Sequence, residues 1–219
     1  MTPSRPPARG SSREDILDAA EAIFAARGFE GASMRAIADE AGVAQALLHY
    51  HYKTKEGLFE AMFARRSGAI NRIRLARLDV MLARGKTSVE DIVEALLRPT
   101  IEAGHDPSLG GGRFAGLILA VSTSEGDWQK GLVARSYDPM AERFISALKA
   151  ALPGLDRANA TWGYLFVVGA ALTQMTPTGR ADRLSEGEAR DDDTDAMLAR
   201  AVTFAAAGLR ALAAEEHGH

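Results

Sequence analysis

Residues 33–59 gather side chains that can hydrogen-bond to, or pack on, a nucleic acid. The stretch reads SMRAIADEAGVAQALLHYHYKTKEGLF. A glutamine amide such as Gln45 can pair with the edge of adenine, and apolar side chains such as Ala46 and Leu47 can pack on the methyl group of thymine. Hydroxyl, imidazole and ammonium groups bind phosphate oxygens. This combination indicates recognition chemistry, and no nucleophile or pair of acids in it stands out as catalytic.

Short helices must position these groups. Ser33 can cap a helix that Gly42 ends, and Gln45 to His51 can form a second short helix after a turn. Thr54 can cap a long helix that ends near Gly85. An earlier helix, which begins at Ser11 or Ser12 and stops at Gly28, presents an apolar stripe: Ile16, Ala19, Ala20, Ile23 and Phe24. This order predicts a helix-turn-helix braced by the first helix.

The segment resembles the DNA-binding region of the tetracycline-repressor (TetR) family of bacterial regulators. The matching features are Ile37-Ala38, Ala41-Gly42-Val43, Leu48, Tyr50-His51-Tyr52, Lys55-Glu56 and Leu58-Phe59, together with Gly28 and Phe29 and the apolar stripe of the first helix. Beyond this segment the chain resembles the family only in length and helical character. The resemblance implies a dimeric regulator that binds operator DNA and senses a small molecule, with no cofactor.

The resemblance and the chemistry together predict the DNA contacts. Gln45, Ala46 and Leu47 are expected to meet base edges, and the phosphates are expected to meet side chains and the amino terminus of the long helix. The full predicted set is Ser33, Arg35, Ala44, Gln45, Ala46, Leu47, His49, Tyr50 and Lys55. Three residues depart from the family pattern. Ala44 replaces a capping serine or threonine, at a cost of about 1 kcal/mol; His49 replaces a tyrosine; and Tyr52 replaces a phenylalanine, which is a conservative change if its hydroxyl reaches water.

Composition predicts an all-α protein. The chain has 219 residues, 6% aromatic residues and no cysteine, and little of it alternates as a strand would. We expect a disordered arm (1–10), a DNA-binding domain (11–56) and a ligand-binding and dimerisation domain (57–219). The formal net charge is −3 and the pI about 6.0, so a DNA-binding face must be local. No leader or membrane-spanning run is recognised, which favours the cytoplasm.

The C-terminal part is expected to form long helices separated by breakers. Thr87 is predicted to cap a helix to about Ala103, and residues 104–112 form a loop before a buried helix over 113–124. A helix over 127–151 contains Pro139, which is expected to bend or split it. The last two helices span 156–176 and 194–214, with a polar loop between them.

These last two helices resemble in position the pair that forms the dimer interface in the family. Their small residues allow close approach, and their apolar surface must be covered: Gly163, Gly169, Ala170, Ala171, Ala201, Ala205, Ala206 and Gly208. The alternative is that these residues face only their own core. A two-fold dimer predicts a near-palindromic operator, with recognition helices about 34 to 36 Å apart.

The middle helices are expected to enclose the pocket of a hydrophobic effector. Candidate lining residues are Phe114, Leu117, Ile118, Trp128, Phe144 and Trp162, with His105, Arg113 and Gln174 as polar anchors. Ligand is expected to favour a dimer that does not fit DNA, with coupling of about 1 to 3 kcal/mol through the long helix that joins the domains. The family resemblance implies repression relieved by ligand, with activation as the alternative.

Other features of the sequence have alternative interpretations. His49 and His51 point to different faces of a helix and lack a third ligand, so no metal site is predicted. Gly110 to Gly112 lack the Gly-Lys-Ser/Thr of a phosphate loop, and no catalytic constellation indicates an enzyme. A helical ligand-binding or scaffold module without operator binding stays open as the second function class. Arg5 and Arg9 are either solvated or minor-groove contacts.

Overall fold

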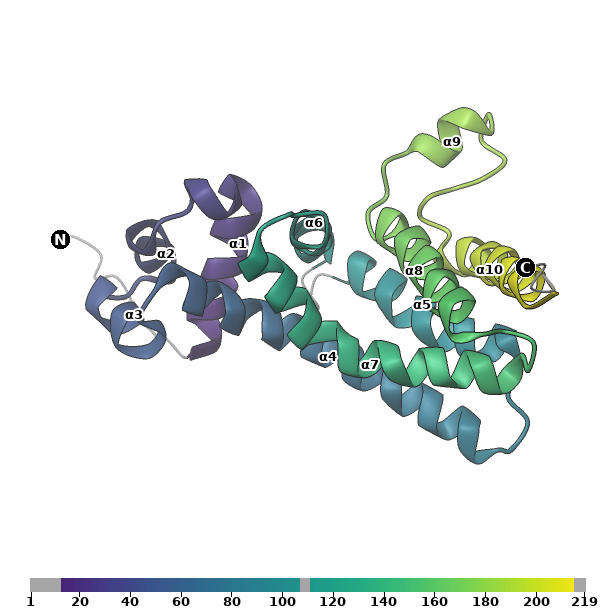
Figure 1. Cartoon of the computed structure of the whole chain (residues 1–219). Coiled ribbons are helices and arrows are strands. Elements are labelled where there is room, and N and C mark those ends of the chain that lie inside the picture. Colours follow the sequence, from purple (N-terminus) through teal and green to yellow (C-terminus); the bar gives the residue numbers. More distant parts are fainter. Residues whose placement is uncertain (1–12, 107–110, 215–219) are drawn as a thin grey trace. The chain divides into compact units, whose positions relative to one another are not determined.

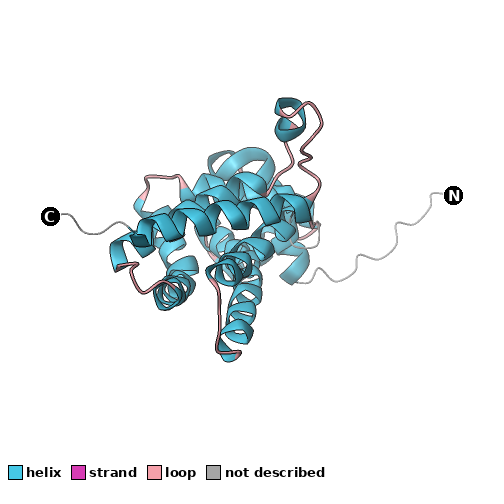
Figure 2. Ribbon diagram, turned by 90° about the vertical axis from the view of Figure 1, so that its right-hand side faces the viewer, coloured by secondary structure: helices cyan, strands magenta, loops and turns pink. Residues whose placement is uncertain are grey.

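The computed structural model describes residues 13–106 and 111–214, and within these ranges every regular element is a helix (Figure 2). The prediction of an all-α protein is confirmed. The chain divides into two compact units, one up to Arg66 and one from Ser67 onward. The predicted arm over residues 1–10 and the caps at Ser11 and Ser12 lie outside the described residues.

The first unit contains three helices and the beginning of a fourth. Ser33 caps the second of them by accepting a hydrogen bond from the backbone N–H of Ala36 at 3.1 Å, and Gly42 ends it in the left-handed conformation, with φ 69°. Gly28, at φ 70°, interrupts the first helix where the sequence predicted its end. The helices are α1 (Arg13–Gly31), α2 (Met34–Ala41), α3 (Gln45–Tyr52) and α4 (Lys55–Ala83).

Aromatic rings form the centre of the first unit. The rings of Phe24 and Phe59 meet edge to face with centroids 4.9 Å apart, and Phe29 packs on both. Ile37 of α2 and Leu48 of α3 are fully buried. Because short helices such as α2 and α3 are unstable alone, this burial is what holds them in place.

The boundary between the units lies ten residues later than the predicted one, at 66/67 instead of 56/57. The first turns of α4 belong to the first unit because they bury four apolar side chains there: Leu58, Phe59, Met62 and Phe63. Arg66 adds an ion pair at 2.5 Å to Glu21 of α1. The start of α4 is therefore part of the first unit, and the rest of the same helix belongs to the second unit.

The described part of the second unit consists of the C-terminal half of α4 and six further helices. Helix α5 contacts both α8 and α10, which also contact each other, and α9 stands apart from them in both views (Figures 1 and 2). The apolar core includes Leu96, Phe144 and Leu209. The helices are α5 (Val89–His105), α6 (Gly111–Ser122), α7 (Asp127–Ala151), α8 (Arg157–Gln174), α9 (Arg180–Leu184) and α10 (Thr194–Ala214).

Several details of the second unit differ from the sequence-based expectations. Ser88, and not Thr87, caps α5, because Ser88 forms a reciprocal capping box with Asp91 while the Thr87 hydroxyl donates to the carbonyl of Met81. Helix α7 continues through Pro139, so of the two predicted outcomes, a bend or a split, the split does not occur. The short helix α9 was not expected in the polar loop; Asp191 holds it by accepting from the backbone N–H groups of Arg180 and Ala181.

Candidate nucleic-acid interface

Helix α3 is anchored by its C-terminal half. Leu48 and Tyr52 are buried, and the guanidinium of Arg13 lies 5.9 Å from the centroid of the Tyr52 ring. The Tyr52 hydroxyl is buried and has no hydrogen-bond partner among the described residues, so the condition for a conservative replacement of phenylalanine is not met. Anchoring at these two positions leaves the opposite face and the first turn of α3 open to a partner.

The first turn of α3 is exposed where the sequence predicted base contacts. Gln45 and Ala46 are exposed, and Leu47 is half-buried. Ala44 occupies the capping position with φ −69° and ψ 135°, and its side chain makes no capping bond, which confirms the expected missing cap. The first N–H groups of α3 are therefore without a side-chain acceptor and can face an anion or a base edge.

Gln45 is oriented by a side chain one turn later. Its Nε2 lies 3.2 Å from Nε2 of His49, and Nδ1 of His49 lies 3.2 Å from the carbonyl oxygen of Lys53. The carbonyl can only accept, so Nδ1 carries the proton and Nε2 accepts from the amide of Gln45. Gln45 keeps its amide oxygen and its second amide hydrogen for a partner, and this is the donor and acceptor pair that adenine requires.

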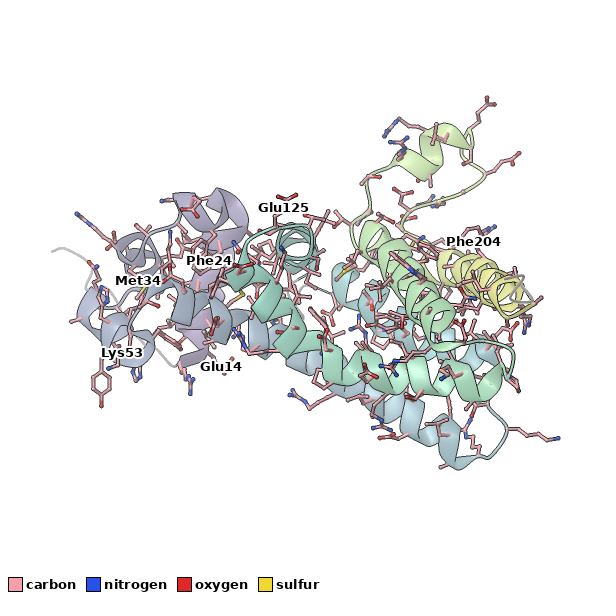
Figure 3. The ribbon with its side chains drawn as sticks, in the orientation of Figure 1. Glu14, Phe24, Met34, Lys53, Glu125 and Phe204 are labelled. Atoms are coloured by element: carbon pink, nitrogen blue, oxygen red, sulfur yellow. The ribbon has the colours of Figure 1, made fainter. Side chains whose placement is uncertain are left out.

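The other predicted DNA residues of this unit lie at the surface around α3. Arg35 is exposed on α2 and has one long ion pair, 3.9 Å, with Asp39. Tyr50 is 72% exposed, and the ammonium of Lys53 lies 5.5 Å from its ring centroid (Figure 3 labels Lys53). Ser33 is exposed, with its hydroxyl oxygen used in the cap of α2. These groups surround α3 with donors suited to phosphate oxygens.

Lys55 has an internal role that the sequence did not predict. Its ammonium donates to the carbonyl oxygens of Phe29 at 2.8 Å and Ala32 at 3.2 Å, and lies 4.4 Å from the Phe29 ring centroid. The charge therefore ties the start of α4 to the end of α1. A phosphate contact by Lys55 stays a prediction, and the exposed alternative in this region is Lys53.

A tight turn joins α3 to α4. Lys53 adopts φ 62° and ψ −55°, and the N–H of Thr54 donates to the carbonyl of Tyr52 at 2.7 Å, which makes a three-residue turn that a β-carbon strains. Gly57 is required beside it, because a Cβ at this position would collide with the Tyr52 carbonyl oxygen. Thr54 caps α4 by accepting from the N–H of Gly57, as predicted. The turn thus fixes where the recognition helix ends.

Ion pairs hold α4 against α1 within the same unit. Glu21 is buried on α1 and meets the guanidinium of Arg66 at 2.5 Å and that of Arg65 at 3.7 Å. Arg65 also reaches Glu14 and Asp18, at 2.7 and 2.6 Å. Glu21 is thus a buried charge with two partners, and removal of either partner would leave its charge less compensated.

The predicted effector residues of the second unit separate into buried and exposed groups. Those in the core are Phe114, Leu117 and Ile118 of α6 and Phe144 of α7, while Trp128, His105 and Gln174 are half-buried and Arg113 is exposed. Trp162 is 58% exposed on α8 and stacks on Phe166, with centroids 5.9 Å apart. The structure therefore places Trp162 at the surface and not among the core residues.

An apolar groove runs between α8 and α10. Its lining is almost entirely aliphatic, aromatic or glycine: Gly163, Phe166, Val167, Ala170, Phe204, Ala205, Gly208, Leu209, Ala211 and Leu212. Phe204 is 78% exposed at this groove and is labelled on α10 in Figure 3. These are the helices and several of the small residues that the sequence assigned to the dimer interface.

Sequence reasoning missed a buried polar group in the second unit. Asn71 and Arg74 of α4 and Thr100 of α5 are buried, and Arg74 donates to both of the other two. The signal was present: in an apolar stripe that includes Ile70 and Leu78, two polar residues occupy positions at helical spacing.

Comparison with known proteins agrees with this geometry. Residues 16–62 match the family model of bacterial regulatory proteins of the tetR family, and residues 94–208 match that of the tetracyclin repressor-like C-terminal domain. The HTH-type transcriptional repressor KstR2 of Mycolicibacterium smegmatis is 38% identical over 60 residues, which are 27% of this chain and 29% of KstR2. The match therefore spans less than a third of that relative.

Solved structures share the whole fold at low identity. The fatty acid degradation regulator FadR of Bacillus halodurans superposes with a TM-score of 0.65 over 91% of this chain and 100% of its own, at 17% identity. FadR of Bacillus subtilis, in complex with stearoyl-CoA, gives a TM-score of 0.55 over 94% and 100%, at 15% identity. With a helix-turn-helix in the first unit and a C-terminal model that covers more than half of its length, the chain belongs to the TetR family of transcriptional regulators.

Proposed function

We propose that the chain is a homodimeric repressor that binds a near-palindromic operator and leaves it when a small molecule binds the second unit. The observation that carries this proposal is the mounting of α3, which buries Leu48 and Tyr52 and leaves Gln45 and Ala46 exposed. A short helix held in this way presents its amino-terminal residues to the major groove.

The first turn of α3 recognises the bases. Gln45, oriented by His49, accepts from N6 and donates to N7 of adenine, and Ala46 and Leu47 pack on thymine methyl groups. Arg35, Tyr50 and Lys53 bind phosphates and set the register, with Ser33 and Lys55 beside them. The local cations account for DNA binding by a chain whose formal net charge is −3.

A second copy of the chain covers the groove between α8 and α10. Helix α10 has a hydropathy and a length that would also suit a membrane span. Its inner face, however, packs into the core through residues such as Leu198 and Leu209, and Arg210 pairs with Glu90 of α5 at 2.7 Å. Helix α10 therefore packs into the second unit and still exposes an apolar face. Such a face is suited to a two-fold interface, in which both copies contribute the same patch.

Effector binding belongs to the second unit, among the core helices α4 to α8. FadR of Bacillus subtilis, which shares the fold, was solved in complex with stearoyl-CoA. In this chain the buried aromatic and aliphatic residues Phe114, Leu117, Ile118 and Phe144 suit an apolar ligand. Helix α4 contributes to both units, so a shift of its C-terminal half changes the half-site spacing. The protein acts in the cytoplasm and catalyses no reaction.

Selection of bound sequences from a random duplex pool at low salt tests the proposal. We expect a near-palindrome, which Gln45→Ala should bind about tenfold or more weakly because a bidentate base contact is lost. The control is Gln129→Ala, which removes a glutamine of α7 in the other unit and should bind like the wild type. Retention of no sequence above background would leave the helical ligand-binding or scaffold module as the better description.

A further inference from the structure

Arg74 is a buried charge in the middle of the second unit. It lies on α4 and is 7% exposed, and its hydrogen bonds to the described residues run to two neutral groups. Nη1 donates to Oδ1 of Asn71 at 2.8 Å, and Nη2 donates to the hydroxyl of Thr100. Within the described ranges no carboxylate pairs with it. Burial lowers the pKa of Arg74, as expected where a positive charge has left water without a counter-charge.

The partners of Arg74 are themselves fixed. The amide nitrogen of Asn71 donates to the carbonyl of Ser136 on α7 at 2.8 Å, and the hydroxyl of Thr100 donates to the carbonyl of Leu96 at 3.0 Å. Both can therefore offer Arg74 only an acceptor oxygen. They hold the guanidinium in one orientation between α4, α5 and α7, and they leave its charge uncompensated.

One donor of the guanidinium has no partner among the described residues. Nε of Arg74 is buried and makes no hydrogen bond with any described residue. Nε–H and the adjacent Nη–H form the parallel pair of donors that a carboxylate accepts with its two oxygens. In Arg74 the Nε–H is free to donate to a carboxylate, whose second oxygen can accept from Nη2 beside or in place of the hydroxyl of Thr100.

Two phenols extend the same cluster. The charge of Arg74 acts on the side chains of Tyr137 on α7 and Tyr164 on α8, and burial raises the pKa of both. At neutral pH both are therefore protonated and can donate to an anion. Beyond them the cluster is bordered by apolar side chains, including Leu78, Met140 and Phe144. A ligand anchored at Arg74 must carry an apolar body.

We infer that the effector of this regulator is an apolar carboxylic acid whose carboxylate pairs with Arg74. This inference rests on the proposed function, because it names the ligand class of the sensing unit. Ion pairing at Arg74 supplies the counter-charge that the protein itself lacks there. To admit the ligand, α4, α5, α7 and α8 must move apart around Arg74. Because α4 continues into the DNA-binding unit, that movement is available to release the operator.

The test compares carboxylates with their neutral analogues on the full-length protein without DNA. Hexanoate, decanoate, palmitate, benzoate and phenylacetate are each titrated beside the corresponding primary amide, with calorimetry and thermal melting as readouts. We expect at least one acid to bind the wild type about tenfold or more tightly than its amide, because the charge-assisted pair is lost in the amide. If no acid in the panel is preferred to its amide, the inference is overturned.

Substitution of Arg74 assigns the preference to this residue. In Arg74→Met the preference for acid over amide should disappear, while Arg74→Lys should keep part of it because the charge remains. The control is Arg72→Met, which removes an exposed arginine of the same helix and should leave the preference intact. A preference that survives in Arg74→Met overturns the inference. Because DNA is absent from these titrations, failure here is distinct from failure of the operator selection.

Discussion

At the scale of single residues, contacts decide what a matching motif can do. Gln45 and Lys55 were assigned to DNA on chemistry and resemblance alone. The structure leaves the amide of Gln45 exposed and braced by His49, whereas the ammonium of Lys55 is bonded to the carbonyl oxygens of Phe29 and Ala32. Sequence spacing can reveal the first arrangement, since residues 45 and 49 are one turn apart. Sequence spacing cannot reveal the hydrogen bonds of Lys55, since Lys55 and Phe29 meet only after folding.

Because the imidazole of His49 hydrogen-bonds to the amide of Gln45, we expect the two residues to be energetically coupled in operator binding. Gln45→Ala and His49→Ala should each weaken binding, but the double variant should be weaker than Gln45→Ala by only a small amount, with a coupling energy of about 1 kcal/mol. Fluorescence anisotropy with the selected operator measures the cycle. A matched cycle between Gln45 and Tyr50, which do not contact each other, should be additive. Additivity in both cycles would mean that His49 does not position Gln45.

The Tyr52 hydroxyl predicts a stabilising substitution. It is buried and unpaired among the described residues, so its removal abolishes a desolvation cost while the ring stays in place. Tyr52→Phe should raise the free energy of unfolding by about 1 kcal/mol, measured by urea denaturation. Tyr50→Phe, at an exposed tyrosine of the same helix, should change it by much less. Loss of stability in Tyr52→Phe would show that the hydroxyl has a partner, such as a bound water molecule.

At the scale of elements, the local sequence predicts where a helix is capped and where it breaks. It predicts less well which core the helix packs into. Ser33, Gly42 and Thr54 act as their residue types predict, because a cap depends on neighbours within one turn. The boundary at 66/67 was not predicted, because it depends on which core receives the first turns of α4. The Arg74 cluster was not predicted for the same reason, because its members come from four helices, α4, α5, α7 and α8, that meet only in the folded core.

We expect that glycine in place of Lys53, in the turn after α3, relieves backbone strain. Lys53 has a positive φ that glycine adopts without a steric cost. Lys53→Gly should raise the free energy of unfolding by about 1 kcal/mol, since strain of this kind costs about 1 to 3 kcal/mol and the added chain entropy removes part of the gain. Lys86→Gly, at an exposed loop lysine without positive φ, should lower it by a few tenths of a kcal/mol. Equal effects in urea denaturation would argue against strain at Lys53.

The capping box of α5 predicts a pH-dependent contribution to stability. Hydrogen bonds from the Ser88 hydroxyl and backbone N–H lower the pKa of Asp91. The ionised form is thus favoured in the folded state, and its contribution is present above the ordinary aspartate pKa, about 3.9, and is lost as the pH falls through the lowered value. Asp91→Asn should therefore destabilise at pH 7 and approach the wild type near pH 3.

Urea midpoints at the two pH values measure this effect. Asp138→Asn, which neutralises an exposed carboxylate on α7 outside any cap, serves as the matched control and should differ little from the wild type at either pH. A deficit of Asp91→Asn that is the same at both pH values would mean that the charge of Asp91 does not contribute to the cap.

At the scale of the whole molecule, the proposed operator recognition uses two copies of α3 that bind at once. One short helix makes few base contacts, and linking two of them raises affinity far beyond that of either. The groove between α8 and α10 is the surface that we propose joins the copies. Sequence analysis identified its helices from small and apolar residues, but exposure separates Phe166 and Phe204, which face outward, from Val167 and Leu209, which are buried.

We expect that a charge placed in the apolar groove between α8 and α10 makes the protein a monomer. Phe204→Arg places a charge at the centre of the proposed interface, where burial without a counter-charge is costly, so sedimentation should report a monomer and operator affinity should fall about a hundredfold. The control is Leu184→Arg on α9: Leu184 is 75% exposed, close to the exposure of Phe204, but lies outside the groove. It should sediment as a dimer and bind the operator normally. If Phe204→Arg stays dimeric, another surface joins the copies, and the spacing of the two α3 helices must be set by that surface.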